Sequence, residues 1–300
     1  MRAVWTFWSA PYCDHYHRFW HSEKHHLFSW VLSFAQASQH YPDTLLVTDS
    51  RGARMLVDSL QLPFRHVDLR FDELNTATYD NEWWVLGKLK TYAAQTTSFV
   101  HIDNDVFLWK PLPAAVTAAS VFAQNPESFF IEDQSLYRLQ PFLDGIEKLD
   151  GWLPPEWLWY AAQRGNRAFC CGIFGGHDLE FIRHYANRAI EIVCHPRNQA
   201  VWPALGVRDN ILVEQYFLAA CFEYHQQQRS SPHDTLKASY LFPSSADAFD
   251  PECATRVGYT HLIGDAKNSR DIADRLARRV QCDYPEYYER CLTYLRGARG

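Results

Sequence analysis

The fold of this chain is decided by the stretch FVHIDNDVFL, residues 99–108. Its first four residues are mostly apolar or β-branched, which is typical of a strand buried inside a sheet. Asp103 and Asp105 follow two residues apart, so on extended backbone they would project from the same side, with Asn104 turned away. A cation would relieve the repulsion between two such carboxylates, and hard divalent cations keep positions open for phosphate oxygens. The alternative is a polar strand end without chemistry, because short motifs often match by accident.

Alternating strands and helices precede this stretch. Apolar runs predict strands at 3–8, 44–48 and 64–69, and helical spacing predicts helices at 27–39, about 52–60 and 82–95. We expect a polar loop over 70–81. This alternation with short turns predicts an α/β fold, with a mainly parallel, doubly wound sheet flanked by helices.

The second half of the chain continues with less regular spacing. We expect 107–113 to leave the sheet and turn, and we expect further strands at 121–124 and 257–260 and helices at about 178–193 and 209–224. The domain prediction is one domain over 1–270 with an insertion at about 125–168, followed by a helical extension over 271–300 packed on it.

An aromatic segment over 149–160, centred on Pro154-Pro155, stands out within the insertion. Aromatic side chains around a rigid Pro-Pro could form a partly exposed platform that binds an acceptor molecule. The alternative is that these side chains pack the insertion against the sheet.

Composition excludes several classes of protein. The chain has 300 residues, of which 47% are hydrophobic and 21% charged, an ordinary globular profile with enough apolar mass for a core. A net charge of −6 argues against a nucleic-acid partner. The tail beyond residue 271 is rich in Arg and Tyr, but its interleaved acids favour a solvated helical face over a membrane surface.

The cysteines and the N-terminal residues bear on the compartment. None of the eight cysteines forms a C-x-x-C pair, so their spacing disfavours a structural zinc site, and reduced thiols of a cytosolic protein are the simpler account. The first residues lack the long apolar core of a signal peptide, and no run approaches the length of a membrane span. We therefore expect a soluble cytoplasmic protein.

Histidines cluster between His15 and His26. The pairs His17/His21 and His21/His25 have the i, i+4 spacing of a helical metal site. No acidic ligand completes the set, so histidines of a loop or of a substrate contact are the favoured alternative.

Two further motifs lie downstream. Glu214-Gln215 stands near the start of a predicted helix, and His261, Gly264 and Lys267 form an H-x-x-G-x-x-K pattern after the strand at 257–260. The H-x-x-G-x-x-K motif and the D-x-D each follow an apolar strand. Two such motifs in one chain are much less plausible as accidental matches than either motif alone.

The order of these motifs resembles nucleotide-sugar-dependent glycosyltransferases of the GT-A fold, most closely the family-8 type that includes glycogenin and bacterial lipopolysaccharide galactosyltransferases. In that family a helix with a basic residue leads into a strand ending in D-x-D, as residues 87–92 lead into 101–106 here. Cys171-Gly172 resembles the start of a later asparagine-glycine strand. The chain departs from the family at Asn268-Ser269, where proline-tryptophan often follows the lysine, and over 125–168, so the sugar and the acceptor stay undetermined.

The resemblance implies a donor site. Asp103, Asp105 and His261 would hold a divalent cation, Mn²⁺ or Mg²⁺. Lys267 would add a positive charge at the diphosphate of a UDP-sugar, and Gly264 would let the backbone approach it. The remaining implied donor contacts are Trp8, Ser9, Lys88 and Asn104.

The resemblance also implies transfer of a hexose with retention of anomeric configuration. Gln215 resembles the residue beneath the anomeric carbon, where its amide oxygen could stabilise an oxocarbenium-like state; Glu214 could contribute instead, and Asp105 completes the catalytic set. The acceptor could be a glycan, a lipid-linked sugar, a peptide side chain or a natural product.

Two other functions are compatible with parts of the pattern. The first is a sugar-nucleotide-binding protein without turnover. The intact set of Asp103, Asp105, His261 and Lys267 argues against it, because a protein without turnover would not need all four residues. The second is a sugar nucleotidyltransferase, which usually carries a glycine-rich loop with a basic residue after the first strand. Residues 8–11, Trp-Ser-Ala-Pro, form no such loop.

Overall fold

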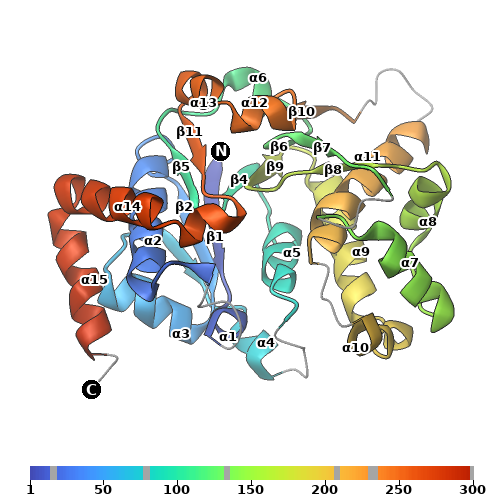
Figure 1. Ribbon diagram of the computed structural model, residues 1–300, viewed down its shortest axis with the longest axis horizontal. Helices are drawn as coiled ribbons and strands as arrows, with labels where there is room; N and C mark the ends of the chain where they lie inside the picture. The colour runs from blue at the N-terminus through green and yellow to red at the C-terminus, as the bar shows by residue number, and fades with distance from the viewer. Residues whose placement is uncertain (14–18, 77–81, 132–135, 206–209, 229–235, 298–300) are drawn as a thin grey trace. The chain divides into compact units, whose positions relative to one another are not determined.

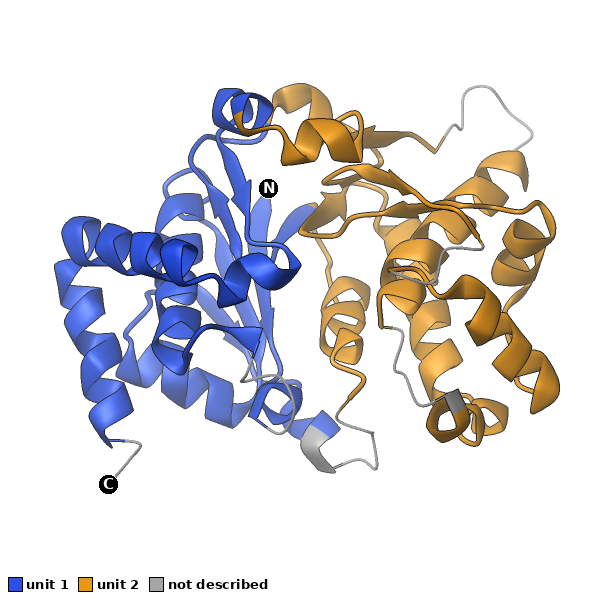
Figure 2. Cartoon of the chain, in the orientation of Figure 1, with its two compact units in different colours: residues 1–81, 99–112, 252–300 blue, residues 82–98, 113–251 orange. Residues whose placement is uncertain are grey.

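The computed structural model describes residues 1–13, 19–76, 82–131, 136–205, 210–228 and 236–297. The chain divides into two compact units (Figure 2). Unit 1 comprises residues 1–81, 99–112 and 252–300, and unit 2 comprises residues 82–98 and 113–251. Each unit is described by itself below.

Unit 1 contains four parallel strands in the order β4-β1-β2-β3. Their bounds are Arg2–Phe7 for β1, Thr44–Thr48 for β2, His66–Asp68 for β3 and Phe99–Ile102 for β4. Every residue of β2 and β4 is buried. Parallel strands covered on both faces need continuous apolar runs, which is why these strands could be predicted from the sequence.

Helices surround these strands (Figure 1). In unit 1 they are α1 (Ser9–Pro11), α2 (Glu23–Ala37), α3 (Ser50–Ala53) with the π-helical turn η3 (Arg54–Ser59), α4 (Asp72–Thr76), α13 (Pro251–Val257, whose first residue belongs to unit 2), the 3₁₀ turn η6 (Gly264–Asn268), α14 (Arg270–Asp283) and α15 (Pro285–Gly297). The loop expected over 70–81 is wrong in part, because α4 lies within it, and residues 77–81 lie outside the described residues.

The C-terminal helices pack on α2. Gln36 donates a hydrogen bond from Nε2 to the Tyr284 hydroxyl at 2.9 Å, and the rings of Phe28 and Tyr288 stack with centroids 4.9 Å apart. The Arg- and Tyr-rich tail is therefore held to α2 by contacts of its tyrosine side chains.

A second, two-stranded sheet in unit 1 joins segments far apart in sequence. β5 (Val106–Leu108) pairs antiparallel with β11 (Tyr259–His261), with Val106 opposite His261. The segment leaves the larger sheet, as expected, but its first residues enter this second sheet, which was not predicted. Local sequence could not reveal this pairing, because the partner strand lies about 150 residues later.

Unit 2 contains the strands β10-β6-β9, in which β6 pairs parallel with β10 and antiparallel with β9. A separate antiparallel pair joins β7 and β8. The strand bounds are β6 Val121–Ala123, β7 Pro126–Ser128, β8 Arg167–Phe169, β9 Ile173–Gly176 and β10 Ala238–Tyr240. Taken with unit 1, the prediction of an α/β fold with mainly parallel strands and flanking helices is confirmed.

The helices of unit 2 include the predicted ones and several that were not predicted. Their bounds are α5 Val85–Ala93, α6 Ala114–Thr117, α7 Leu139–Lys148, α8 Pro155–Ala162, α9 Leu179–Cys194, η4 Pro196–Asn198, α10 Val201–Leu205, the π-helical turn η5 Leu212–Tyr216, α11 Phe217–Gln228 and α12 Ser245–Phe249.

The second half of the aromatic segment at 149–160 forms the start of the helix α8, which has a proline at its first position. Trp157 is fully buried and stacks on Phe217 with ring centroids 5.6 Å apart, and Tyr160 is also buried. These two side chains therefore pack in the interior, but their ring partners lie on helices and not on the sheet that the alternative named. Leu158 of the same helix is exposed.

Two further findings concern the helices and the cysteines. Among the described residues, no helix combines the length and the apolar character that crossing a bilayer requires. All eight cysteines are free thiols, as expected.

Candidate functional site

The acid pair occupies a turn between β4 and β5. β4 ends at Ile102, and the Val106 N–H donates to the Asp103 carbonyl at 3.0 Å, which closes the turn. The expectation that Asp103 and Asp105 project from extended backbone is therefore wrong. The chain bends here because residues 106–108 pair with β11 and do not continue along β4.

This turn brings three potential metal ligands together. Ligand atoms of Asp103, Asp105 and His261 all lie within 4.8 Å of one another, and His261 Nε2 is 3.4 Å from Asp105 Oδ1. The pairing of β5 with β11 places His261 beside the turn, and the Leu262 N–H donates to the Asp105 carbonyl at 3.0 Å. Backbone hydrogen bonds thus fix the three predicted ligands.

Lys267, on η6, adds a positive charge to this group. Its Nζ pairs with Asp105 Oδ2 and lies 5.8 Å from the centroid of the Trp20 ring. Burial favours the neutral form of Asp105, but the charges of Lys267 and His261 outweigh it and hold the pKa of this carboxyl far below its ordinary value. Asp105 is therefore an ionised carboxylate.

The group fits a divalent cation. Asp105 is 3% exposed, and among the described residues its buried Oδ1 accepts no hydrogen bond. A buried carboxylate oxygen without a donor is costly unless something positive faces it. Two carboxylates with one imidazole form a mixed set that Mn²⁺ accepts, and the part-exposed Asp103 leaves one side open.

Helix α2 supports the turn from behind. Ser33 Oγ donates to the Asp103 carbonyl at 3.2 Å and accepts from Trp5 Nε1 at 3.0 Å. Asn104 Nδ2 donates to Ser29 Oγ at 3.1 Å. The side chain of Asn104 therefore anchors the turn to α2, a role that the sequence alone did not indicate.

The loop after β1 is held by an aspartate that the sequence did not single out. Asp49 Oδ2 accepts hydrogen bonds from the backbone N–H and the hydroxyl of Ser9 at 3.0 and 2.7 Å, while Oδ1 accepts from the Gly52 N–H. Trp8 and Ser9 are both buried. Asp49 directly follows an apolar strand, as Asp103 does, and this shared position is the signal that could have revealed it.

Gly264 adopts a left-handed backbone, with φ 56°. Apart from its two chain neighbours, no described residue has an atom within 4 Å of the position that a Cβ would take, so its backbone is open to approach. This is the conformation that glycine takes without strain.

Lys88, Glu214 and Gln215 belong to unit 2. Lys88 Nζ lies 2.7 Å from Glu214 Oε1, which also accepts from the Tyr92 hydroxyl at 3.0 Å. Lys88 is 6% exposed and Glu214 fully buried. Gln215 Oε1 accepts from the Tyr137 hydroxyl at 2.6 Å. Glu214 and Gln215 lie on η5, and π-helical turns of this kind are frequent at functional sites.

The histidine cluster is only partly described. His15 and His17 lie outside the described residues. The rings of His21 and His25 are 5.5 Å apart, and neither belongs to a group of three potential ligands among the described residues. His26 lies fully buried in unit 1, stacked on Tyr12 with ring centroids 4.0 Å apart.

We expect His26 to make unit 1 sensitive to acid. Burial, with a further contribution from Lys267, lowers the pKa of His26 from 6.5 to about 3. The unfolded chain therefore takes up a proton at this residue near pH 6.5, whereas the folded chain does not, so stability falls as the pH decreases from about 6.5 towards 3. The loss is about 1.4 kcal/mol per pH unit.

Urea unfolding of His26→Phe and of the wild type at pH 7 and pH 5 checks this. Phenylalanine can keep the stacking on Tyr12, so the variant should lose about 2 kcal/mol less than the wild type between these two pH values. His177→Phe, at an exposed position, is the control. An equal loss in His26→Phe and the wild type would contradict the prediction.

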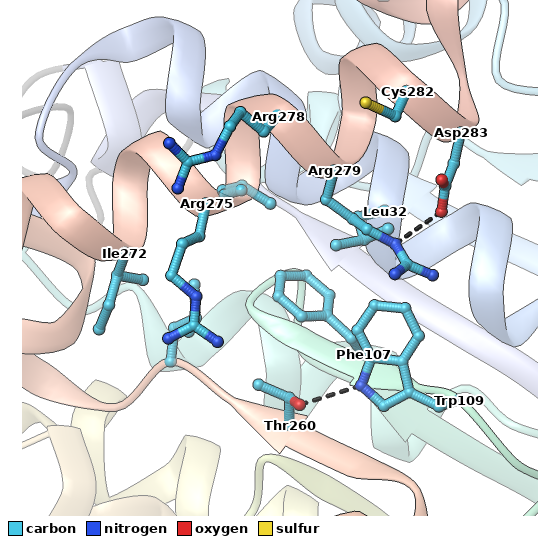
Figure 3. A pocket seen from close by; sticks show the side chains of 12 residues that line it. Leu32, Phe107, Trp109, Thr260, Ile272, Arg275, Arg278, Arg279, Cys282 and Asp283 are labelled. Carbon is cyan, nitrogen blue, oxygen red and sulfur yellow. Dashed lines mark hydrogen bonds and ion pairs between the residues drawn. The ribbon is translucent and has the colours of Figure 1, made fainter.

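A pocket of about 680 Å³ lies between β11 and α14 in unit 1 (Figure 3). Trp109 Nε1 donates to Thr260 Oγ1 at 3.0 Å, and the guanidinium of Arg279 lies 4.9 Å from the Trp109 ring centroid and 2.6 Å from Asp283. Thr260 lines the pocket, whereas the next residue, His261, meets Asp105, because successive side chains of a strand point to opposite faces.

Comparisons with known proteins complete the description. A family model described as a family of unknown function (DUF6734) matches residues 1–294. One similar solved structure is the galactosyltransferase LgtC in complex with donor and acceptor sugar analogues, at 12% identity and a TM-score of 0.44, covering 93% of this chain and 94% of that one. Another is an active-site mutant of LgtC, at 14% identity and a TM-score of 0.43 with the same coverage. Among curated proteins no match was found.

Proposed function

Since the chain belongs to DUF6734, a family of unknown function, we propose from its own residues that it is a metal-dependent glycosyltransferase. It would move a hexose from a UDP-sugar to an acceptor with retention of anomeric configuration. The observation that carries the proposal is the convergence of Asp103, Asp105 and His261, with Lys267 paired to Asp105, in the motif order that resembles GT-A enzymes.

The residues of unit 1 would bind the diphosphate. Asp103, Asp105 and His261 would hold Mn²⁺ or Mg²⁺, which when bound neutralises the negative charge that develops on the departing UDP. Lys267 has three donor hydrogens, so its ammonium can contact a phosphate oxygen while it stays paired with Asp105. Gly264 would let a phosphate approach the backbone. The buried loop of Trp8 and Ser9 would shape the nucleoside end of the site.

Gln215 is our candidate for stabilising the oxocarbenium-like state through its amide oxygen. We prefer it to Glu214 because the Glu214 carboxylate is fully buried and engaged by Lys88 and Tyr92. Gln215 is part-exposed, and its amide oxygen accepts a hydrogen bond from a neutral hydroxyl, that of Tyr137. The same pairing makes Lys88 a residue that positions η5, and a direct contact of Lys88 with the donor stays a prediction. Free thiols and the absence of a membrane-spanning helix among the described residues support the proposal that the protein acts in the cytoplasm.

Calorimetric titration of UDP in Mn²⁺ and in EDTA tests the donor site. Because the metal and the diphosphate would share one site, we expect UDP to bind at least about tenfold more tightly with Mn²⁺. Uridine is the matched control, since it lacks the diphosphate and should bind equally in both buffers. Equal affinity for UDP in Mn²⁺ and EDTA would refute the proposed site.

A second assay separates turnover from binding. Slow release of UDP from one member of a panel of UDP-sugars would support a transferase, whereas metal-dependent binding without release would favour a sugar-nucleotide-binding protein. A nucleotidyltransferase would instead release pyrophosphate from UTP and a sugar 1-phosphate.

A further inference from the structure

Unit 2 contains another group of three potential metal ligands. Ligand atoms of Glu156 on α8, His184 on α9 and His225 on α11 all lie within 4.8 Å of one another. Glu156 Oε1 is 2.7 Å from His184 Nε2 and 3.8 Å from His225 Nε2. The two imidazole rings stand nearly perpendicular, with centroids 4.6 Å apart. Three helices thus aim one ligand each at a common point.

Two polar atoms of this group have no hydrogen-bond partner among the described residues. Glu156 is 3% exposed, and its Oε2 is buried without a hydrogen-bond partner among the described residues. His225 Nε2 is also buried without one, since 3.8 Å to Glu156 is too long for a hydrogen bond. Buried polar atoms are normally paired, and a cation ligated by this group would satisfy both of these atoms.

A carboxylate and two imidazoles face one another here. Glu156 Oε1 lies close to both rings, and His184 comes nearer to it than His225 does. Arg188, which interacts electrostatically with Glu156, is paired with Glu191 at 2.7 Å. A cation bound here would therefore meet one negative ligand and two imidazoles.

We propose that Glu156, His184 and His225 bind a zinc ion. Two imidazoles and one carboxylate are a set that zinc accepts, with a fourth position left open. Zinc–nitrogen bonds of about 2.0–2.1 Å put tetrahedral ligand atoms about 3.3 Å apart, and the two distances from Glu156 Oε1 bracket this value. Cysteine spacing disfavoured a structural zinc site, but this group uses no cysteine.

The site would tie α8, α9 and α11 together. α11 continues directly from η5, which carries Glu214 and Gln215, so the ion would also hold the end of the helix that positions those residues. This inference does not depend on the proposed function of unit 1, because it concerns ligands from unit 2 alone.

Zinc retention tests the site. The starting protein carries Asp103→Ala and Asp105→Ala, which removes the ligand group of unit 1. After stripping, zinc loading and dialysis, we expect one zinc per chain by elemental analysis. Loss of a partner that only supports a ligand costs about 10–100-fold in metal affinity, so Glu156→Gln or His225→Gln should weaken zinc binding by at least that factor in a chelator competition.

Matched variants and a second probe keep the result interpretable. Glu180→Gln and His177→Gln change exposed residues of the same types and should retain zinc as the parent does. Co²⁺ in the parent should give the visible absorption of a four-coordinate site, which also tests the proposal if a ligand variant fails to fold. Failure of the parent to retain zinc, or equal retention by Glu156→Gln and Glu180→Gln, would overturn the proposal.

Discussion

Asp105→Asn is expected to abolish Mn²⁺-dependent binding of UDP and to slow release of UDP from a UDP-sugar by at least about a hundredfold. Loss of a residue that only supports a metal ligand costs about 10–100-fold, and loss of a ligand itself should cost more. Asparagine keeps the shape of the side chain but removes the charge that faces Lys267 and His261. Calorimetry with Mn²⁺ and a UDP-release assay measure the two effects.

Asp265→Asn is the matched control, since Asp265 is an exposed acid within the same closing motif and should leave both measurements unchanged. We also expect Asp105→Asn to lower the free energy of unfolding without metal by about 1–3 kcal/mol, because Lys267 and His261 lose their partner. Metal-dependent UDP binding that survives in a folded Asp105→Asn protein would remove the carboxylate from the proposed site.

Glu214→Gln is expected to destabilise the protein by about 3–5 kcal/mol, because it removes the carboxylate charge that faces the buried ammonium of Lys88. Lys88 and Glu214 are joined at 2.7 Å with side chains 8% and 0% exposed. The double variant Lys88→Met with Glu214→Gln should recover most of the loss, since both charges of the pair are then removed. Urea unfolding of both single variants and the double variant gives the coupling energy.

The pair Arg167 and Glu223, also in unit 2, provides the comparison. Its side chains are 48% and 32% exposed and 3.5 Å apart, so its coupling should lie below about 1 kcal/mol. If Glu214→Gln retained full stability but lost turnover, Glu214 would be a catalytic group, and the structural role assigned to its pairing with Lys88 would be wrong.

Much of unit 1 could be predicted because its signals are local. β2 and β4 are buried on both faces, so their apolar runs are continuous, and the acids of the D-x-D follow one of these runs directly. The residues of the H-x-x-G-x-x-K motif also lie close together in the sequence, because η6 follows β11 almost directly. Both motifs lie close together in the structure, where Lys267 pairs with Asp105 and His261 lies beside the two aspartates.

The remaining features depend on partners far away in sequence. A lysine on a helix usually lies in solvent, and nothing near Lys88 indicates a carboxylate 126 residues later. The turn at Asp103 depends on the pairing of β5 with β11, and Glu156, His184 and His225 share no motif because each comes from a different helix. Such contacts are set by tertiary packing, which local periodicity does not report.

The pairing of β5 with β11 has a consequence for how the protein is made. During translation the two aspartates emerge about 150 residues before His261, and all of unit 2 is synthesised in between except its first segment. A nascent chain can therefore fold much of unit 2 before Lys267 has been synthesised. Until then Asp103 and Asp105 still repel each other. Contacts of such long sequence separation also form slowly, so the site should be among the last parts of the molecule to mature.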